Sequence, residues 1–221
     1  VVPLPQGMTL FEAMALGTAG YTAALGIVRM EENGLRPANG KVIVSGATGG
    51  VGSLAIDILA GLGYTVVALT GKADQRNYLE GLGAAEVMPR AALDSARMRP
   101  LDKALWAGAV DSLGGDVLAW MASTMQQNGT IASVGLAATA SLQTTVMPFI
   151  LRGVSLLGVD SAYTAMPLRR RVWERLARDM RPPHLVELTR TIPFAELPSA
   201  FEPFIAGAAH GRTVVSIHPE N

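Results

Sequence analysis

The chain has 221 residues, of which 49% are apolar, and its 18 basic residues balance its 18 acidic ones. This length suits one large domain with a sizeable core, and the balanced charge argues against nucleic acid as a partner and against an acidic tail. The chain contains no cysteine, which excludes disulfides and thiolate chemistry and fits a reducing, cytoplasmic location.

Neither a membrane span nor a signal peptide is predicted. The chain has no uninterrupted apolar run of the roughly 18 to 20 residues that cross a bilayer. A charged region followed by a short apolar one, which would mark a signal peptide, does not open the sequence. We therefore expect no membrane partner.

The N-terminal part predicts an extended entry followed by two helical stretches. Thr9 and Glu12 have the spacing of a capping box at the start of the first helix. Gly34 follows the second helix at the position where helices commonly end on glycine. The predicted segments are an entry over residues 1–7, a helix over 8–16, a flexible joint over 17–20 and a helix over 21–33.

A glycine-rich turn follows the first predicted strand, which covers residues 41–45. Gly46, Gly49 and Gly52 have the spacing G-x-x-G-x-x-G, and an apolar helical pattern begins directly after them. Such a turn leaves backbone N–H groups at a helix N-terminus, where they bind phosphate. Alone, the triplet also fits an ordinary strand-to-helix turn, so the interpretation depends on the strand that comes next.

That second strand, predicted over residues 64–70, ends in Thr70, Gly71 and Lys72, with Arg76 close behind. An NAD site would carry an acidic residue about 20 residues past the glycines, to bind the ribose 2′-hydroxyl. Hydroxyl and cationic donors stand there instead, and these suit a 2′-phosphate. The segment predicts an NADP site, although Lys72 and Arg76 also fit a solvated helix start.

Strands and helices alternate through residue 180, which predicts an α/β fold with a doubly wound parallel sheet, the Rossmann fold. After residue 184 the pattern changes, and we expect the C-terminal tail to join a different sheet. The further predicted strands cover 85–88, 106–112, 130–134, 154–159, 188–193 and 212–217. The further predicted helices cover 74–82 (with Asp74 as its cap), 117–126, 145–151, 167–180 and 197–207.

Several charged residues have two interpretations. Asp111, at a strand end, fits a general base but fits a cap of the following helix better. Arg90 suits an adenosine phosphate or water, and Arg212 suits the cofactor or a surface strand start. The arginine run 169–171 resembles a nucleic-acid patch, but the neutral chain favours a solvated helix face.

No metal site is predicted. The chain lacks the H-E-x-x-H motif and any Cys/His cluster. The three histidines are scattered late in the sequence, and surface positions suit them better than catalysis. They are His184, His210 and His218.

Motifs along nearly the whole chain are similar to the medium-chain dehydrogenase/reductase superfamily. Within it, they most resemble the zinc-free quinone-oxidoreductase-like branch and its NADPH-dependent acrylyl-CoA reductases. The motifs are GATGGVG at 46–52, TGK at 70–72, YLxxLGA at 78–84, LWAGAVD at 105–111, TTVMPFILR at 144–152, GVDS at 158–161 and GRT at 211–213.

The resemblance implies an NADPH-dependent enzyme that reduces the activated C=C bond of an enoyl thioester such as acryloyl-CoA, or a quinone or enone. A non-catalytic NADP(H)-binding module is the alternative hypothesis. The resemblance also implies which residues bind the cofactor, whereas the catalytic residue stays unknown. The implied residues are Thr22, Thr48, Gly49, Gly50, Val51, Thr70, Gly71, Lys72, Arg90, Leu136, Ser161 and Arg212. Zinc-dependent relatives carry a cysteine ligand where this chain has Thr18, which agrees with a site that lacks metal.

Family members begin with a GroES-like catalytic domain that this chain lacks, and the substrate cleft lies between the two domains. The resemblance therefore implies an entry segment over 1–16, a Rossmann domain over 17–184 and a return to the catalytic domain over 185–221. It also implies a homodimer, formed through the apolar edge strand at 154–159.

Overall fold

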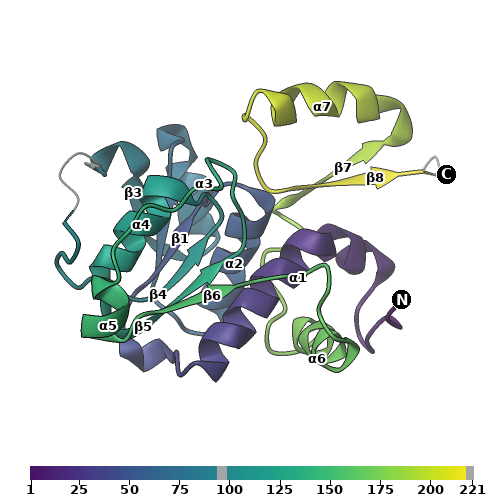
Figure 1. The fold of residues 1–221 in the computed structure, drawn as a ribbon. Coiled ribbons are helices and arrows are strands. Elements are labelled where there is room, and N and C mark those ends of the chain that lie inside the picture. The colour runs from purple at the N-terminus through teal and green to yellow at the C-terminus, as the bar shows by residue number, and fades with distance from the viewer. Residues whose placement is uncertain (94–98, 218–221) are drawn as a thin grey trace.

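A computed structural model describes residues 1–93 and 99–217 of the chain. Six parallel strands form one sheet in the order β3-β2-β1-β4-β5-β6 (Figure 1). The strands are β1 (Val42–Ser45), β2 (Val66–Thr70), β3 (Ala84–Pro89), β4 (Trp106–Asp111), β5 (Met125–Ser133) and β6 (Ser155–Gly158). This order confirms the predicted doubly wound Rossmann fold, whose direction of winding reverses between β1 and β4.

Helices cover both faces of the sheet (Figure 1). Alternate side chains of one strand enter different cores: Val42 and Val44 pack on one face, and Ile43 packs on the other. Burial on both faces explains why this strand is a continuous apolar run in the sequence. The helices are α1 (Leu10–Glu32), α2 (Gly50–Gly61), α3 (Arg76–Gly81), α4 (Gly115–Thr124), α5 (Met147–Arg152) and α6 (Met166–Leu176).

The two helices predicted at the N-terminus form one kinked element, α1. Thr9 and Glu12 form the predicted capping box, with the N–H of Glu12 donating to Oγ1 of Thr9 at 3.2 Å. The predicted four-residue joint is reduced to a kink at Gly17, whose φ of 48° is not helical. The chain leaves the helix through Gly34, which has a φ of 98°.

By length and composition, α1 could cross a membrane, and it is the one such helix among the described residues. However, 61% of its most apolar window is buried inside the fold. That burial is typical of a core helix in a protein whose sheet is covered by helices.

The C-terminal segment forms a second, separate sheet, as predicted. Strands β7 (Thr189–Pro193) and β8 (Arg212–Ser216) pair in parallel, and α7 (Leu197–Ile205) connects them. None of the residues of α7 is buried, and Figure 1 shows this unit beside the main sheet. Short 3-10 turns complete the fold at η1 (Pro37–Asn39), η2 (Ala73–Gln75), η3 (Arg90–Ala92) and η5 (Phe194–Glu196).

Two local predictions are wrong. Asp74 does not cap α3: the helix begins after Gln75, and no side chain caps it. Strand β5 begins at Met125, before the turn predicted at Asn128. Asn128 has a φ of 57°, so the turn residues lie within the strand as an irregularity, and the register shifts there.

Candidate nucleotide-binding site

A cleft of about 640 Å³ lies at the carboxyl ends of four neighbouring strands, β2, β1, β4 and β5. Ligands of open α/β sheets bind at this edge, where the strand order reverses. Three groups of residues line the cleft. They are the glycine turn (Gly46, Thr48, Gly49, Gly50, Val51, Gly52), the end of β2 with Arg90 (Leu69, Thr70, Gly71, Lys72), and later segments (Ser112, Leu113, Val134, Gly135, Leu136, Ala137, Gly207, Ala209).

The glycine turn is built from close backbone contacts. Gly46 has a φ of 59°, and its carbonyl accepts a hydrogen bond from the N–H of Gly49 at 2.9 Å. A Cβ on Gly52 would stand 2.3 Å from that same carbonyl oxygen, so only glycine fits there. No side chain caps α2, which leaves its N-terminal amides available to an anion.

The end of β2 places donors beside this turn. Oγ1 of Thr70 accepts from the N–H of Lys72 at 3.0 Å and fixes the local turn. The ammonium of Lys72 donates to the carbonyl of Ala209 at 2.8 Å. The guanidinium of Arg90 lies 3.5 Å from where a Cβ on Gly71 would stand. The end of β2 therefore carries a threonine hydroxyl and a lysine, and an arginine guanidinium lies beside Gly71.

The charge of the cleft is one-sided. Its lining includes Lys72 and Arg90 and no carboxylate side chain. Within the described ranges, neither cation forms an ion pair, whereas Arg76 pairs with Glu80 and donates to the carbonyl of Val87. The residues present thus fit a dinucleotide that carries an extra phosphate. Arg76, which the sequence placed beside Lys72, points elsewhere.

Most of the predicted cofactor-binding residues line this one cleft. Thr48, Gly49, Gly50, Val51, Thr70, Gly71, Lys72, Arg90 and Leu136 do so. Thr22, Ser161 and Arg212 are not among its lining residues, and their roles stay predictions.

Arg212 lies next to the glycine turn. Its Nε donates to the carbonyl of Ala15 at 2.7 Å, and its Nη1 lies 2.9 Å from where a Cβ on Gly50 would stand. Burial lowers the pKa of its guanidinium, but an arginine stays charged in proteins. A half-buried cation therefore stands against the start of α2.

Thr22 and Ser161 are both held by backbone contacts. Thr22 is buried in α1 and donates from Oγ1 to the carbonyl of Thr18 at 2.7 Å. The carbonyl of Ser161 accepts from Nη2 of Arg169 at 2.9 Å, and that guanidinium lies 4.8 Å from the ring centre of Tyr21. Arg169 therefore fixes the loop after β6 and is engaged within the fold.

Asp111 does not cap α4 as predicted, because the N-cap is Gly114 and no side chain caps the helix, but its contacts are structural. The carboxylate is fully buried, and Oδ2 accepts from the N–H of Gly114 at 2.8 Å. Oδ1 accepts from Oγ of Ser45 at 2.6 Å and from the N–H of Leu113 at 3.2 Å. Although α4 begins one residue after these contacts, the side chain stabilises the turn that leads into it.

Two parts of the cleft were not among the predicted binding residues. Ser112 follows β4 directly and Gly135 lies two residues after the end of β5, so their position near strand ends was a signal that could have found them. Gly207 and Ala209 come from the C-terminal segment, and no local pattern points to them. His210, predicted at the surface, is exposed, and His184 contacts Asp57; His218 lies outside the described residues.

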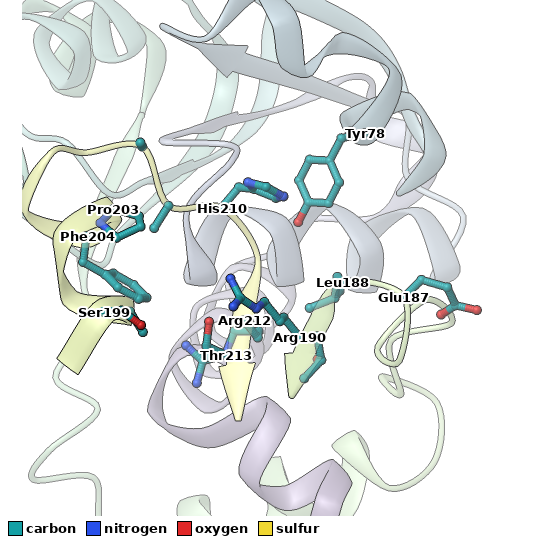
Figure 2. Close-up of a pocket in the computed structure, with 14 residues that line it drawn as sticks. Tyr78, Glu187, Leu188, Arg190, Ser199, Pro203, Phe204, His210, Arg212 and Thr213 are labelled. Carbon is teal, nitrogen blue, oxygen red and sulfur yellow. The ribbon is translucent and has the colours of Figure 1, made fainter. Parts of the chain in front are cut away.

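A second pocket, of about 440 Å³, lies between the C-terminal segment and α3 (Figure 2). The rings of Tyr78 and His210 stand edge to face, with centres 5.3 Å apart. Figure 2 shows this pair above Arg212 and Leu188, which belong to the C-terminal segment. The pocket and the nucleotide cleft share Ala209, so the loop before β8 separates them.

A family model described as "Zinc-binding dehydrogenase" matches residues 50–178. The residues present do not fit a zinc site. The sequence has no cysteine, and within the part of the chain that the structure describes, no three His, Asp or Glu side chains gather to hold a metal.

Two curated relatives match nearly the whole chain. "Putative quinone oxidoreductase YhfP" of Bacillus subtilis is 45% identical over 98% of this chain and 66% of its own length. "Acrylyl-CoA reductase AcuI" of Ruegeria pomeroyi is 44% identical over 99% of this chain and 66% of its own length. This chain thus spans about two thirds of the length of these relatives.

Solved structures agree with the fold. The Bacillus subtilis yhfP structure with bound NAD superimposes with a TM-score of 0.94 at 46% identity, covering 98% of this chain and 66% of that one. The Escherichia coli K-12 YhdH structure with bound NADPH gives a TM-score of 0.93 at 43% identity, covering 98% and 67%. The first of these structures therefore contains NAD, and the second contains NADPH.

Proposed function

Because this chain belongs to the zinc-binding dehydrogenase family, within the medium-chain dehydrogenase/reductase superfamily, we propose that it forms the cofactor-binding part of an NADPH-dependent reductase. The observation that carries this proposal is the cleft where Lys72 and Arg90 meet a glycine turn and no carboxylate. A 2′-phosphate needs positive charge and donors, and a ribose 2′-hydroxyl does not.

Each part of the cleft would hold one part of the cofactor. The N-terminus of α2, with Thr48, Gly49, Gly50 and Val51, would bind the pyrophosphate through backbone amides and the helix dipole. Thr70, Gly71, Lys72 and Arg90 would bind the 2′-phosphate. Further contacts are proposed for Thr22, Leu136, Ser161 and Arg212. When bound, NADPH supplies a hydride to the β-carbon of an activated C=C bond, and a proton adds at the α-carbon.

For the substrate we propose an enoyl thioester of the acryloyl-CoA type, because AcuI carries that name and shares 44% of aligned residues. A quinone or enone is the alternative that the name of YhfP supports. We name no catalytic residue in this chain. A non-catalytic NADP(H)-binding module remains the rival if no such substrate is reduced.

The arrangement of domains follows the same proposal. Residues 17–184 would form the Rossmann domain, residues 1–16 its entry, and residues 185–221 a return to a catalytic domain. The exposed apolar face of α7, with Phe201 and Phe204, supports contact with a further domain. We also propose a homodimer through the free edge of β6, which sedimentation over a range of protein concentrations would test.

Titration with NADPH and NADH, followed by nicotinamide fluorescence, tests the cofactor proposal. We expect NADPH to bind about tenfold or more tightly than NADH, since a charge-assisted hydrogen bond contributes about 1.5–3 kcal/mol. Equal affinities would contradict the proposed 2′-phosphate site. Turnover by the full-length gene product with acryloyl-CoA, quinones and enones then separates the reductase from the binding module.

A further inference from the structure

The loop between α7 and β8, residues 207–211, crosses from the second sheet to the nucleotide cleft, and we call it the strap. Gly207 and Ala209 line the cleft itself. The strap belongs to the C-terminal segment, yet it contacts elements that lie far earlier in the sequence. Figure 2 shows one of these contacts, where His210 faces Tyr78 of α3.

Contacts on both sides fix the path of the strap. The N–H of Gly211 donates to the carbonyl of Thr48 in the glycine turn at 3.1 Å. The N–H groups of Ala208 and Ala209 both donate to the carbonyl of Pro203 in α7, at 2.8 and 3.0 Å. The carbonyl of Ala209 is therefore held at a defined place on the cleft wall.

That carbonyl accepts the hydrogen bond from the ammonium of Lys72, at 2.8 Å. An ammonium has three donors, so one bond to the strap leaves two for another acceptor. Within the described residues Lys72 forms no ion pair, and the strap accepts a hydrogen bond from its charged end. A lysine side chain has high rotamer entropy. A contact that already fixes it reduces the conformational entropy that is lost when a ligand binds.

We propose that the strap is a positioning element for cofactor selectivity: the Ala209 carbonyl holds the Lys72 ammonium at the mouth of the cleft, aimed at the 2′-phosphate. This inference rests on the proposed NADPH function and adds that the C-terminal segment, through Lys72, sets the preference for NADPH over NADH. Movement of the strap then weakens NADPH binding more than NADH binding, because only NADPH carries the group that Lys72 binds.

The test displaces the strap by a substitution and measures the ratio of the affinities for NADPH and NADH. In Gly211→Ala, the new Cβ would stand 2.4 Å from the carbonyl oxygen of Leu188 on a backbone with φ of 61°, so the strap must shift. The matched control is Gly63→Ala, which also has a positive φ, 82°, but whose Cβ meets nothing within 4 Å. Dissociation constants for NADPH and NADH are measured for both variants, with and without Lys72→Met.

We expect Gly211→Ala to reduce the NADPH/NADH affinity ratio roughly three- to tenfold, the cost of immobilising one flexible side chain. The same change in the Lys72→Met background should leave the ratio unaltered, because the strap acts through Lys72. Gly63→Ala should keep the ratio of the parent protein. If Gly211→Ala does not fold by circular dichroism, His210→Ala, which removes the ring contact with Tyr78, takes its place.

Two results would overturn the inference about the strap. Equal weakening of both cofactors would show that the strap only supports the fold, and a lower ratio that persists in Lys72→Met would show that it acts elsewhere. A parent protein with no preference for NADPH would instead overturn the proposed 2′-phosphate site, and the inference would fall with it.

Discussion

Nδ1 of the His184 imidazole lies 2.8 Å from Oδ1 of Asp57, and the backbone N–H of the same histidine donates to Oδ2 at 2.9 Å. Asp57 is 1% exposed in the middle of α2, so a single residue satisfies both oxygens of a buried carboxylate. The pair ties the segment that leads to β7 to the helix that carries the glycine turn.

Two substitutions of Asp57 should distinguish the contribution of its hydrogen bonds to stability from the contribution of its charge. Asp57→Ala leaves the N–H of His184 without its acceptor and should lower the free energy of unfolding by about 1–3 kcal/mol. Asp57→Asn keeps an oxygen for that N–H, and its amide can donate to Nδ1 of a neutral imidazole. Urea unfolding should therefore place Asp57→Asn nearer the parent protein, and equal losses in the two variants would contradict this.

The same pair predicts a pH dependence. Burial raises the pKa of Asp57 above its ordinary 3.8, although the hydrogen bonds from His184 oppose that shift. The folded state then binds this proton more tightly than the unfolded state, so the contribution is fully present below pH 3.8 and is lost as pH rises through the folded pKa.

Since asparagine does not titrate, the stability of the parent protein relative to Asp57→Asn should fall as pH rises from 3.8. His184, Glu187 and Tyr78 also face this carboxylate, and both proteins retain them. Parallel stability profiles in urea unfolding at a series of pH values would contradict a raised pKa.

Arg90→Met should weaken NADPH binding by about tenfold or more, as expected when one charge-assisted hydrogen bond is lost, and should leave NADH binding unchanged. Arg76→Met is the matched control, because Arg76 pairs with Glu80 outside the cleft. Isothermal titration with both cofactors checks the pair. An equal effect of the two substitutions would mean that general charge, not position, governs binding.

The central strands β1, β2 and β4 were predictable because they are buried along their whole length, which makes each of them a nearly continuous apolar run, as at Val42–Ser45. Boundaries were less predictable where polar residues lie inside an element. Strand β5 includes Gln126 and Gln127, which the apolar pattern could not assign. The sequence predicted a four-residue joint between two helices. In the structure both helical stretches belong to α1, and only Gly17 departs from helical geometry.

The site was predictable where it is local in the sequence. The glycine turn and Thr70–Lys72 each follow one strand, and parallel strands bring their carboxyl ends together. The strap was not predictable, because Lys72 meets Ala209 only through the path of the C-terminal segment. A contact between residues so far apart has no periodicity or spacing that one sequence could reveal.

Two glycines of the turn should respond differently to alanine. A Cβ on Gly52 would stand 2.3 Å from a backbone oxygen that cannot move away, whereas one on Gly50 would meet Nη1 of Arg212, the end of a flexible side chain, at 2.9 Å. Gly52→Ala should lower the free energy of unfolding by about 3 kcal/mol or more. Gly50→Ala should stay folded and weaken NADPH and NADH alike.

Thermal melts and titrations of the two variants check this contrast. Gly81→Ala is the control, since its Cβ meets nothing within 4 Å and its φ is not positive; alanine should be neutral or slightly stabilising in that helix. A Gly52→Ala protein that melts like the parent would show that the turn relaxes more easily than its contacts indicate.

Asp111 should matter for stability and not for proton transfer. A general base must reach the proton that it takes, and this carboxylate is fully buried, with its oxygens engaged by Ser45, Leu113 and Gly114. Asp111→Ala leaves all three donors unpaired and should lower the free energy of unfolding by about 3 kcal/mol, with Ser45→Ala lowering it by about 1 kcal/mol. The double variant should lose less than the sum, because Ser45 and Asp111 share one bond. A stable Asp111→Ala protein that binds NADPH normally but has lost turnover would instead make Asp111 the base, against the burial that places it inside the sheet.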